Sequence, residues 1–215
     1  MMKCPKCGSR RMAPILYGMP CMDEETQRAL RNEELWLGGC CLSAANPRFH
    51  CYACGKNAGS APVLKSRRGQ EDCRDIVTAV VYRRGPGRSS PASQIRIVKK
   101  RGGIRLAVRE ESGDGLAPAH IDRALSEDEW DRLMDRLFCR LFLHEWKKRD
   151  AGKAPGSRVW QLELRMTGGR VRTWSGTDAA APYGRELART FGPFLREARA
   201  VTGPACSRKE DADGT

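Results

Sequence analysis

The chain has 215 residues, of which 40% are hydrophobic and 30% charged, and its formal net charge is +13. This is enough for one large domain, or for one domain with a small appendage. Its longest apolar runs, such as DIVTAVVY, are much shorter than the roughly 18 residues of a membrane helix. No apolar segment follows the basic N-terminus, as a secretory signal would require. We therefore expect a cytoplasmic protein without membrane contact, whose 10 cysteines are ligands, core residues or free thiols.

The positive charge is concentrated in one part of the chain. Residues 61–110 carry 13 basic and 4 acidic side chains, a net of +9, whereas residues 111–150 carry 7 and 10, a net of −3. Arginine's planar guanidinium suits phosphate, so one interpretation of this basic block is nucleic-acid binding. The other is a solvated surface in a protein from a GC-rich genome, since charge by itself indicates only solubility and weak nonspecific binding.

The chain contains two Cys-x-x-Cys-Gly motifs, CPKCG and CYACG, with 43 residues between Cys7 and Cys51. Two residues between the cysteines let both sulfurs face one point, and the glycine permits a left-handed turn. Four thiolates in a tetrahedron are the preferred structural zinc site, although iron accepts the same ligands. We predict one structural Zn²⁺ per chain, held by Cys4, Cys7, Cys51 and Cys54.

The residues between the two motifs must return the chain to its start. RMAPILYG is predicted as a strand leaving the first motif, and DEETQRALRNEELW as a helix with Asp23 as its cap. LGGCCLS and NPRFH are predicted as the returning strands. Residues 1–57 are thus expected to form a zinc ribbon with a helical insert.

Three further cysteines, Cys21, Cys40 and Cys41, lie inside this insert. Each could replace a motif cysteine, and together with His50 they could nominally bind a second metal. Because Cys40 and Cys41 are adjacent, their side chains should diverge on a strand. The alternative is that one of them faces the ribbon core as a small hydrophobic residue.

Residues 1–57 contain, in this order, the stretches MKCPKCGS, ILYGMP and LGGCC, then a proline and HCYACG. In these stretches the chain resembles a bacterial zinc-ribbon family of uncharacterised proteins. The resemblance implies zinc at the four motif cysteines and carries no activity with it. Further along, VWQLEL, a Gly-Gly pair and SGTDAAAPYGRELARTF are similar to the closing segment of other uncharacterised bacterial domains, with Asp178 in place of an asparagine.

The sequence after the ribbon changes in character twice. Residues 58–73 are small, polar and basic, and are interpreted as a linker. RDIVTAVVYRR then predicts a strand, and SQIRIVKKR and IRLAVRE predict a hairpin around Gly102-Gly103. Apolar residues alternate with arginine in this hairpin, which indicates a sheet with one apolar face and one arginine-coated face. ESGDGLAPAHIDRA is expected to be a loop or short turn.

The remaining segments predict two helices and a second hairpin. Ser126 and Glu129 form a capping box before a helix through WDRLMDRLFCRLFLHEWKKR. RVWQLELRM and VRTWSG form a hairpin around Gly168-Gly169, and GRELARTFGPFLREARAV a last helix interrupted at Gly192-Pro193. Residues 74–201 should then be an α+β domain in the order β-β-β-α-β-β-α. Two helices would cover one face of its antiparallel sheet, and a disordered tail would follow at 202–215.

The three histidines do not form a catalytic pattern. His144-Glu145 lacks the second histidine of a zinc-protease helix, and His120 lies in a predicted loop. The sequence has no glycine-rich loop ending in Lys-Ser or Lys-Thr, and no nucleophile elbow. Four thiolates also complete the shell of zinc, which leaves no position for a catalytic water. An enzyme whose site is assembled from other residues is kept as a third hypothesis, after the two binding functions described next.

The main hypothesis is therefore a non-enzymatic, zinc-binding bacterial protein that acts as a binding or adaptor module for another protein. Its two parts should fold independently, because the linker has few residues able to build an interface. The alternative is a nucleic-acid-associated ribbon protein that uses an arginine-rich sheet face. Its candidate phosphate contacts are Arg96, Lys99, Lys100, Arg101, Arg105 and Arg109.

Overall fold

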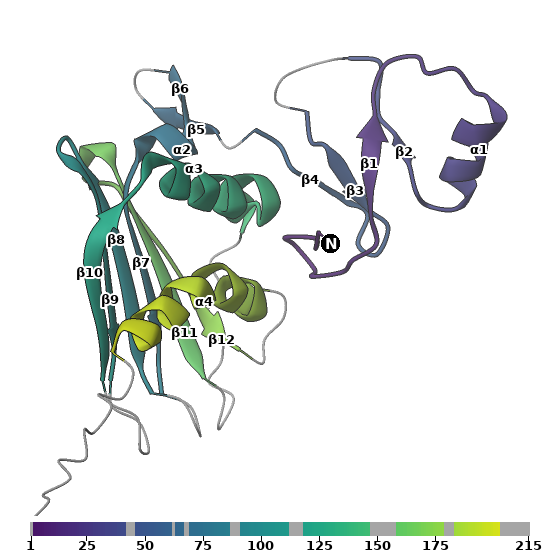
Figure 1. Ribbon diagram of the computed structural model, residues 1–215. Coiled ribbons are helices and arrows are strands. Elements are labelled where there is room, and N and C mark those ends of the chain that lie inside the picture. The colour runs from purple at the N-terminus through teal and green to yellow at the C-terminus, as the bar shows by residue number, and fades with distance from the viewer. Residues whose placement is uncertain are drawn as a thin grey trace, which may run out of the picture.

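A computed structural model of the protein describes residues 2–41, 46–61, 63–66, 69–86, 91–111, 118–146, 158–178 and 183–202. The described elements have the expected α+β composition. They form a small four-stranded sheet near the N-terminus, a two-stranded hairpin, and a six-stranded antiparallel sheet with helices on one face (Figure 1). The strands outside the six-stranded sheet are β1 (Met12–Leu16), β2 (Trp36–Leu37), β3 (Phe49–Cys51), β4 (Lys56–Ala58), β5 (Val63–Ser66) and β6 (Gly69–Asp72).

The small sheet has the strand order β2-β1-β3-β4. β1 pairs antiparallel with β3 and parallel with β2. Between β1 and β2 the chain forms α1 (Glu24–Arg31), which begins at Asp23 as predicted. The Asp23 carboxylate accepts a hydrogen bond of 2.8 Å from the Thr26 amide. The helical insert predicted for this segment is therefore confirmed.

The segment expected to be a linker, residues 58–73, contains regular structure. β4 ends at Ala58, β5 and β6 pair as an antiparallel hairpin, and the short helix α2 (Cys73–Ile76) begins at the end of the segment. VLKS and GQED lack the apolar alternation of a half-buried strand, so their pairing leaves no hydrophobic pattern in the sequence. The strand predicted from Arg74 begins later, after α2.

The six-stranded sheet has the order β10-β9-β8-β7-β11-β12, and every neighbouring pair is antiparallel. Hairpins join β8 to β9 through Gly102-Gly103 and β11 to β12 through Gly168-Gly169, as predicted. The strands are β7 (Val77–Arg84), β8 (Ser93–Lys100), β9 (Gly103–Glu110), β10 (Ala119–Leu125), β11 (Val159–Met166) and β12 (Val171–Thr177).

The predicted order of elements is wrong at β10, because the structure has a strand where the sequence predicts a loop. Arg123 occupies an inward-facing position between Ile121 and Leu125, and this charge hides the apolar alternation. In the fold the Arg123 guanidinium is neutralised by Glu129 at 2.8 Å and by Glu197 at 2.6 Å. The domain therefore has four strands before α3, where three were predicted.

The helix α3 (Glu127–Asp135) begins with the predicted capping box of Ser126 and Glu129. It is shorter than predicted, because a π-helical turn (Arg136–Arg140) follows and Phe142 adopts a left-handed conformation with φ of 51°. A 3₁₀ turn (Leu143–Glu145) comes next. The predicted basic last turn at residues 147–149 lies outside the described residues.

The helix α4 (Tyr183–Val201) is continuous through Pro193, so the predicted interruption at Gly192-Pro193 is wrong. Proline removes one backbone hydrogen bond, but Leu187, Phe191 and Leu195 on either side of it are buried against the sheet. Phe191 stacks on Tyr82 of β7 with ring centroids 4.5 Å apart. This packing holds the helix together across the proline. The predicted tail lies almost wholly outside the described residues.

Both α3 and α4 cover the same face of the large sheet, as predicted (Figure 1). The core between these layers joins the inward residues of all six strands to the apolar faces of the two helices. Among the described residues, no helix combines the length and the hydropathy that crossing a bilayer requires. The largest fully buried side chains include Trp130, Tyr82, Phe138, Phe142, Phe191, Ile95, Ile97 and Leu106.

Candidate metal centre

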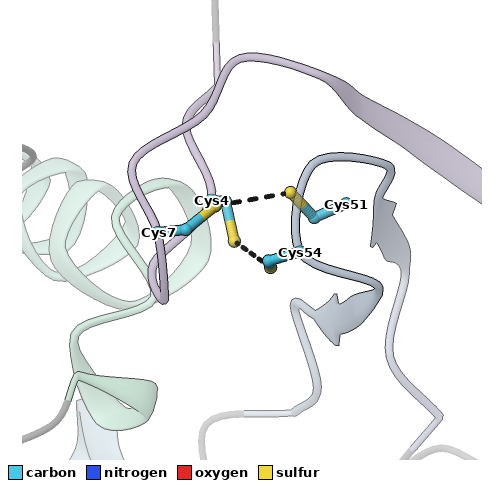
Figure 2. A group of neighbouring side chains, drawn as sticks. All are labelled: Cys4, Cys7, Cys51 and Cys54. Atoms are coloured by element: carbon cyan, nitrogen blue, oxygen red, sulfur yellow. Dashed lines mark hydrogen bonds between the residues drawn. The ribbon is translucent and has the colours of Figure 1, made fainter.

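The cysteine cluster, defined here as Cys4, Cys7, Cys51 and Cys54, is assembled by the pairing of β1 with β3. The first motif precedes β1 and the second begins at the last residue of β3. Met12 lies opposite Cys51 in the register of these strands, which brings the two motifs together (Figure 2). The four sulfurs all lie within 4.8 Å of one another.

The spacing of these sulfurs fits a tetrahedral metal ion. Cys4 Sγ lies 3.8 Å from Cys54 Sγ, and Cys7 Sγ lies 3.6 Å from Cys51 Sγ. A regular tetrahedron with metal–sulfur bonds of about 2.3 Å has sulfur–sulfur edges of about 3.8 Å. The donor set therefore matches a closed four-thiolate site, and the predicted assembly of these four residues is confirmed.

The two motifs form the same backbone turn. The amide of Gly8 donates to the Cys4 carbonyl at 2.9 Å, and the amide of Gly55 donates to the Cys51 carbonyl at 2.8 Å. Both glycines have positive φ angles, of 79° and 65°. A residue with a Cβ is strained in this conformation, which explains the glycine that follows each second cysteine.

Burial is the largest single influence on the pKa values of Cys4, Cys7 and Cys51. It raises the pKa of Cys4 to about 12, although the Lys6 and Cys7 amides oppose the shift, and it also raises the pKa of Cys7. Burial acts on Cys51 as well, but hydrogen bonds from the Cys54 and Ala53 amides hold its pKa below the ordinary value. Metal binding must release protons from such thiols, so affinity falls as the solution becomes more acidic.

The remaining cysteines of the insert do not join the cysteine cluster. Cys21, Cys40 and Cys41 are all exposed, so neither of the adjacent pair faces the ribbon core as one prediction required. His50 is buried, stacks on Trp36 at 3.7 Å and places Nδ1 2.7 Å from the Asn57 side-chain oxygen. Across the described ranges, no second group of three or more metal-ligating side chains comes together.

His144 and Glu145 connect the two parts of the chain. Glu145 Oε1 accepts hydrogen bonds from the Gly59 amide at 2.8 Å, the Ser60 amide at 3.1 Å and the Ser60 hydroxyl at 2.9 Å. His144 Nε2 lies 3.1 Å from the Ser60 carbonyl oxygen, so the neutral ring donates from this nitrogen. The side chains of both residues are almost fully buried. Gly59 and Ser60 thus contact the second part of the chain, although they lie in the segment expected to have few residues able to build an interface.

Acidification should destabilise the protein through His144. Burial lowers the pKa of this histidine, even though Glu145 and the Ser60 carbonyl favour its charged form. The unfolded chain then binds the proton more readily than the folded chain. The contribution of His144 to stability is therefore complete above about pH 6.5 and is lost as the pH falls toward the folded pKa.

This prediction is checked by urea unfolding of the wild type and of His144→Gln at about pH 7.5 and about pH 5.5. The free energy of unfolding should fall further in the wild type, because the variant no longer carries the titrating group. Equal decreases in the two proteins would assign the pH dependence to other groups.

The predicted phosphate contacts divide between the two faces of the sheet. Arg96, Arg105 and Arg109 alternate with buried residues and are exposed on the face opposite the helices, as predicted. Lys99 lies on the helix side, where it pairs with Glu127 at 2.6 Å. The other two positions are exposed, with Lys100 at the end of β8 and Arg101 in the hairpin turn.

A second buried polar group, near the end of β7, was not predicted from the sequence. Arg84 pairs with Asp178, the residue that replaces the asparagine expected from the resemblance. Four buried atoms have no hydrogen-bond partner among the described residues: Arg84 Nε, Asp178 Oδ1, Trp160 Nε1 and Tyr82 Oη. Burial raises the pKa of Tyr82 to about 12, so its hydroxyl stays protonated. The residues that carry these atoms lie far apart in the sequence, and no sequence motif predicts that they come together.

Comparison with known proteins does not place the chain in a family. No protein-family model matches the sequence, and the search of curated proteins gives no match. The resemblance of residues 1–57 to a bacterial zinc-ribbon family therefore stays a prediction.

Proposed function

We propose that the protein is a cytoplasmic zinc-binding module without catalytic activity, in which the zinc ribbon of residues 1–57 is joined to a domain that binds a partner protein. The observation that carries this proposal is the sulfur tetrahedron of the cysteine cluster. Four thiolates saturate the coordination shell of zinc, so substrate cannot reach the metal. In the cytoplasm the thiols stay reduced and available for metal.

A structural role for zinc is further supported by the weak core around it. The helix α1 has no buried residue. Among the described residues of 2–58, the buried ones are Cys4, Pro5, Ala13, His50, Cys51 and Ala58. So little apolar burial does not stabilise a sheet in water, and small units of this kind depend on a metal or another staple. Zinc at the cysteine cluster supplies this staple.

Metal analysis and cobalt substitution test the proposal together. The purified protein should contain one zinc per chain at the cysteine cluster, and Co²⁺ in its place should give the visible spectrum of tetrahedral thiolate coordination. Addition of azide should leave that spectrum unchanged, because a closed site has no exchangeable position. A spectrum that changes with azide would indicate an open, catalytic type of site and would refute a purely structural metal.

A second candidate function is nucleic-acid binding on the face of the large sheet opposite the helices, which we call the open face. Arg96, Lys100 and Arg109 are exposed there and have no ion pair among the described residues, whereas Arg105 pairs with Asp122 at 2.7 Å. A shallow hollow of about 230 Å³ is lined by Arg96, Lys100 and Arg105, together with Asp122. Several unpaired cations along one sheet face suit a phosphate backbone.

Replacing Arg96, Arg105 and Arg109 with glutamine should weaken binding to generic DNA or RNA without affecting folding. Exposed substitutions usually change stability by about 0.5 kcal/mol or less. The slope of log affinity against log salt should fall by about one for each lost phosphate contact. Fluorescence anisotropy at several salt concentrations measures both quantities.

The matched control replaces three exposed arginines elsewhere, Arg132, Arg185 and Arg196, and changes the net charge equally. It should retain the wild-type salt slope. If the wild-type protein does not bind nucleic acid at low salt, or if both triple variants bind alike, the open face is only a solvated surface and the protein-partner hypothesis stands alone.

A further inference from the structure

A cleft of about 320 Å³ lies between the cysteine cluster and the second part of the chain. One wall is formed by residues 2–5, and the other by the π-helical turn after α3 and the first turns of α4. In Figure 1 the N-terminal end of the chain lies opposite the ends of these two helices. The volume of the cleft is at the lower end of the range found for small-molecule sites.

Basic side chains from three separate segments line this cleft. Arg136 and Arg140 come from the π-helical turn, Arg189 from α4 and Lys3 from the N-terminal segment. One carboxylate is present among the lining residues, Glu186, and it is shared by Lys3 at 3.0 Å and Arg189 at 3.1 Å. Four basic groups and one acidic group leave an excess of +3 in the cleft. The excess favours an anionic ligand.

The arginines of the π-helical turn are the free cations of the cleft. Arg136 and Arg140 are exposed and form no ion pair with any residue in the described part of the chain. They lie four positions apart, so both side chains leave the turn on the same side. Two guanidinium groups held in this way can bind phosphate oxygens through paired N–H donors.

An aromatic stack lies beside these charges. Trp146 and Tyr183 both line the cleft, and their rings stack with centroids 3.8 Å apart and an angle of 22° between the planes. Trp146 is buried, whereas Tyr183 is half-buried. Together with Leu141 they give the cleft an apolar wall next to its cationic one. This pairing of surfaces suits a ligand with a charged end and a planar or apolar end.

Part of the positive charge has a simpler explanation. Zinc with four thiolates carries a net negative charge, and Lys3 lines the cleft together with Cys4, so it offsets part of that charge. Arg136 and Arg140, however, lie on the opposite wall, which belongs to the second part of the chain. Charge balance at the metal accounts neither for the open volume between the walls nor for the aromatic stack.

We infer that this cleft binds a small ligand that carries a diphosphate group. The phosphates lie against Arg136 and Arg140, and Arg189 adds a third cation from α4. The rest of the ligand lies along Tyr183 and Leu141. The site goes beyond the function proposed above, because it requires neither the open face of the sheet nor a partner protein.

Isothermal titration of the zinc-loaded, full-length protein with pyrophosphate and with ADP tests this inference. The wild type should bind at least one of the two probes, and Arg136→Gln/Arg140→Gln should weaken that binding at least about tenfold, because two charge-assisted contacts are lost. Tighter binding of ADP than of pyrophosphate would support the inference and add the aromatic stack to the site.

The matched control is Arg132→Gln/Arg185→Gln, which removes two exposed arginines of α3 and α4 that do not line the cleft. This control should bind like the wild type, and metal analysis should show unchanged zinc in both variants. The inference is overturned if the wild type binds neither probe at millimolar concentration, or if the two double variants bind alike. A loss of zinc from Arg136→Gln/Arg140→Gln in a protein that binds neither probe would assign both arginines to charge balance at the metal.

Discussion

Replacement of Cys51 and Cys54 by serine should reduce the zinc content from one ion per chain to none and unfold the N-terminal sheet. The sheet has too few buried side chains to fold on hydrophobic burial. In small structural zinc sites the apparent binding free energy, about 10–16 kcal/mol at neutral pH, is also the folding free energy. Metal analysis gives the zinc content, and hydrogen exchange followed by mass spectrometry locates the change.

Loss of protection should be confined to residues 2–58, because strands β7 to β12 share a separate core with α3 and α4. The matched control is Cys40→Ser/Cys41→Ser. It removes two exposed cysteines from the same part of the chain, and it should keep both the zinc and the protection. Full zinc content in the Cys51→Ser/Cys54→Ser variant would contradict the proposed site and would move the metal to the cysteines of the insert.

The cysteine cluster could be predicted from the sequence because its geometry is local. Each Cys-x-x-Cys-Gly motif determines its own turn, and the same amide–carbonyl bond recurs at Gly8 and Gly55. Only the approach of the two motifs to each other depends on tertiary structure, because the pairing of β1 with β3 brings them together. The alternation of apolar residues and arginine in β8 and β9 was equally local, and its buried and exposed positions are those predicted.

The errors arise where distant residues decide the local structure. The helical pattern continues through LFLHEW, but the π-helical turn after α3 ends at Arg140, and the left-handed Phe142 packs its ring beside Phe49 and Gly59. The ring of Phe142 is fully buried there. No pattern within the helix indicates that a residue 83 positions earlier will receive this side chain, since the contact exists only in the assembled fold.

The same limit applies to charged residues inside the fold. Arg123 made β10 resemble a loop because its two carboxylate partners belong to α3 and α4. In the sequence, Glu145 belongs only to a zinc-protease pattern that lacks its second histidine. Both side chains take their role from partners that are remote in sequence. A prediction based on neighbouring residues alone places such charged side chains on the solvent-exposed surface.

Glu145→Ala should reduce the free energy of unfolding of the second part of the chain by about 2–4 kcal/mol, which is the largest effect we expect for a residue outside the cysteine cluster. Its carboxylate accepts three hydrogen bonds from Gly59 and Ser60, and hydrogen bonds to a charged group contribute about 1.5–3 kcal/mol each, without strict additivity. The substitution also leaves the part-buried amides of Gly59 and Ser60 without this acceptor. Urea unfolding at neutral pH measures the change.

The matched control is Glu127→Ala, because Glu127 has an exposed side chain and a single surface ion pair with Lys99. Such pairs contribute about 0–1 kcal/mol, so this variant should unfold close to the wild type. A double-mutant cycle of Glu145→Ala with Ser60→Ala then isolates the junction itself. A coupling energy above about 0.5 kcal/mol would show that residues 59–60 belong energetically to the second part of the chain. The opposite result has two parts: the effects of Glu145→Ala and Ser60→Ala are strictly additive, and Glu145→Ala costs no more stability than Glu127→Ala. That result would support independent folding of the two parts.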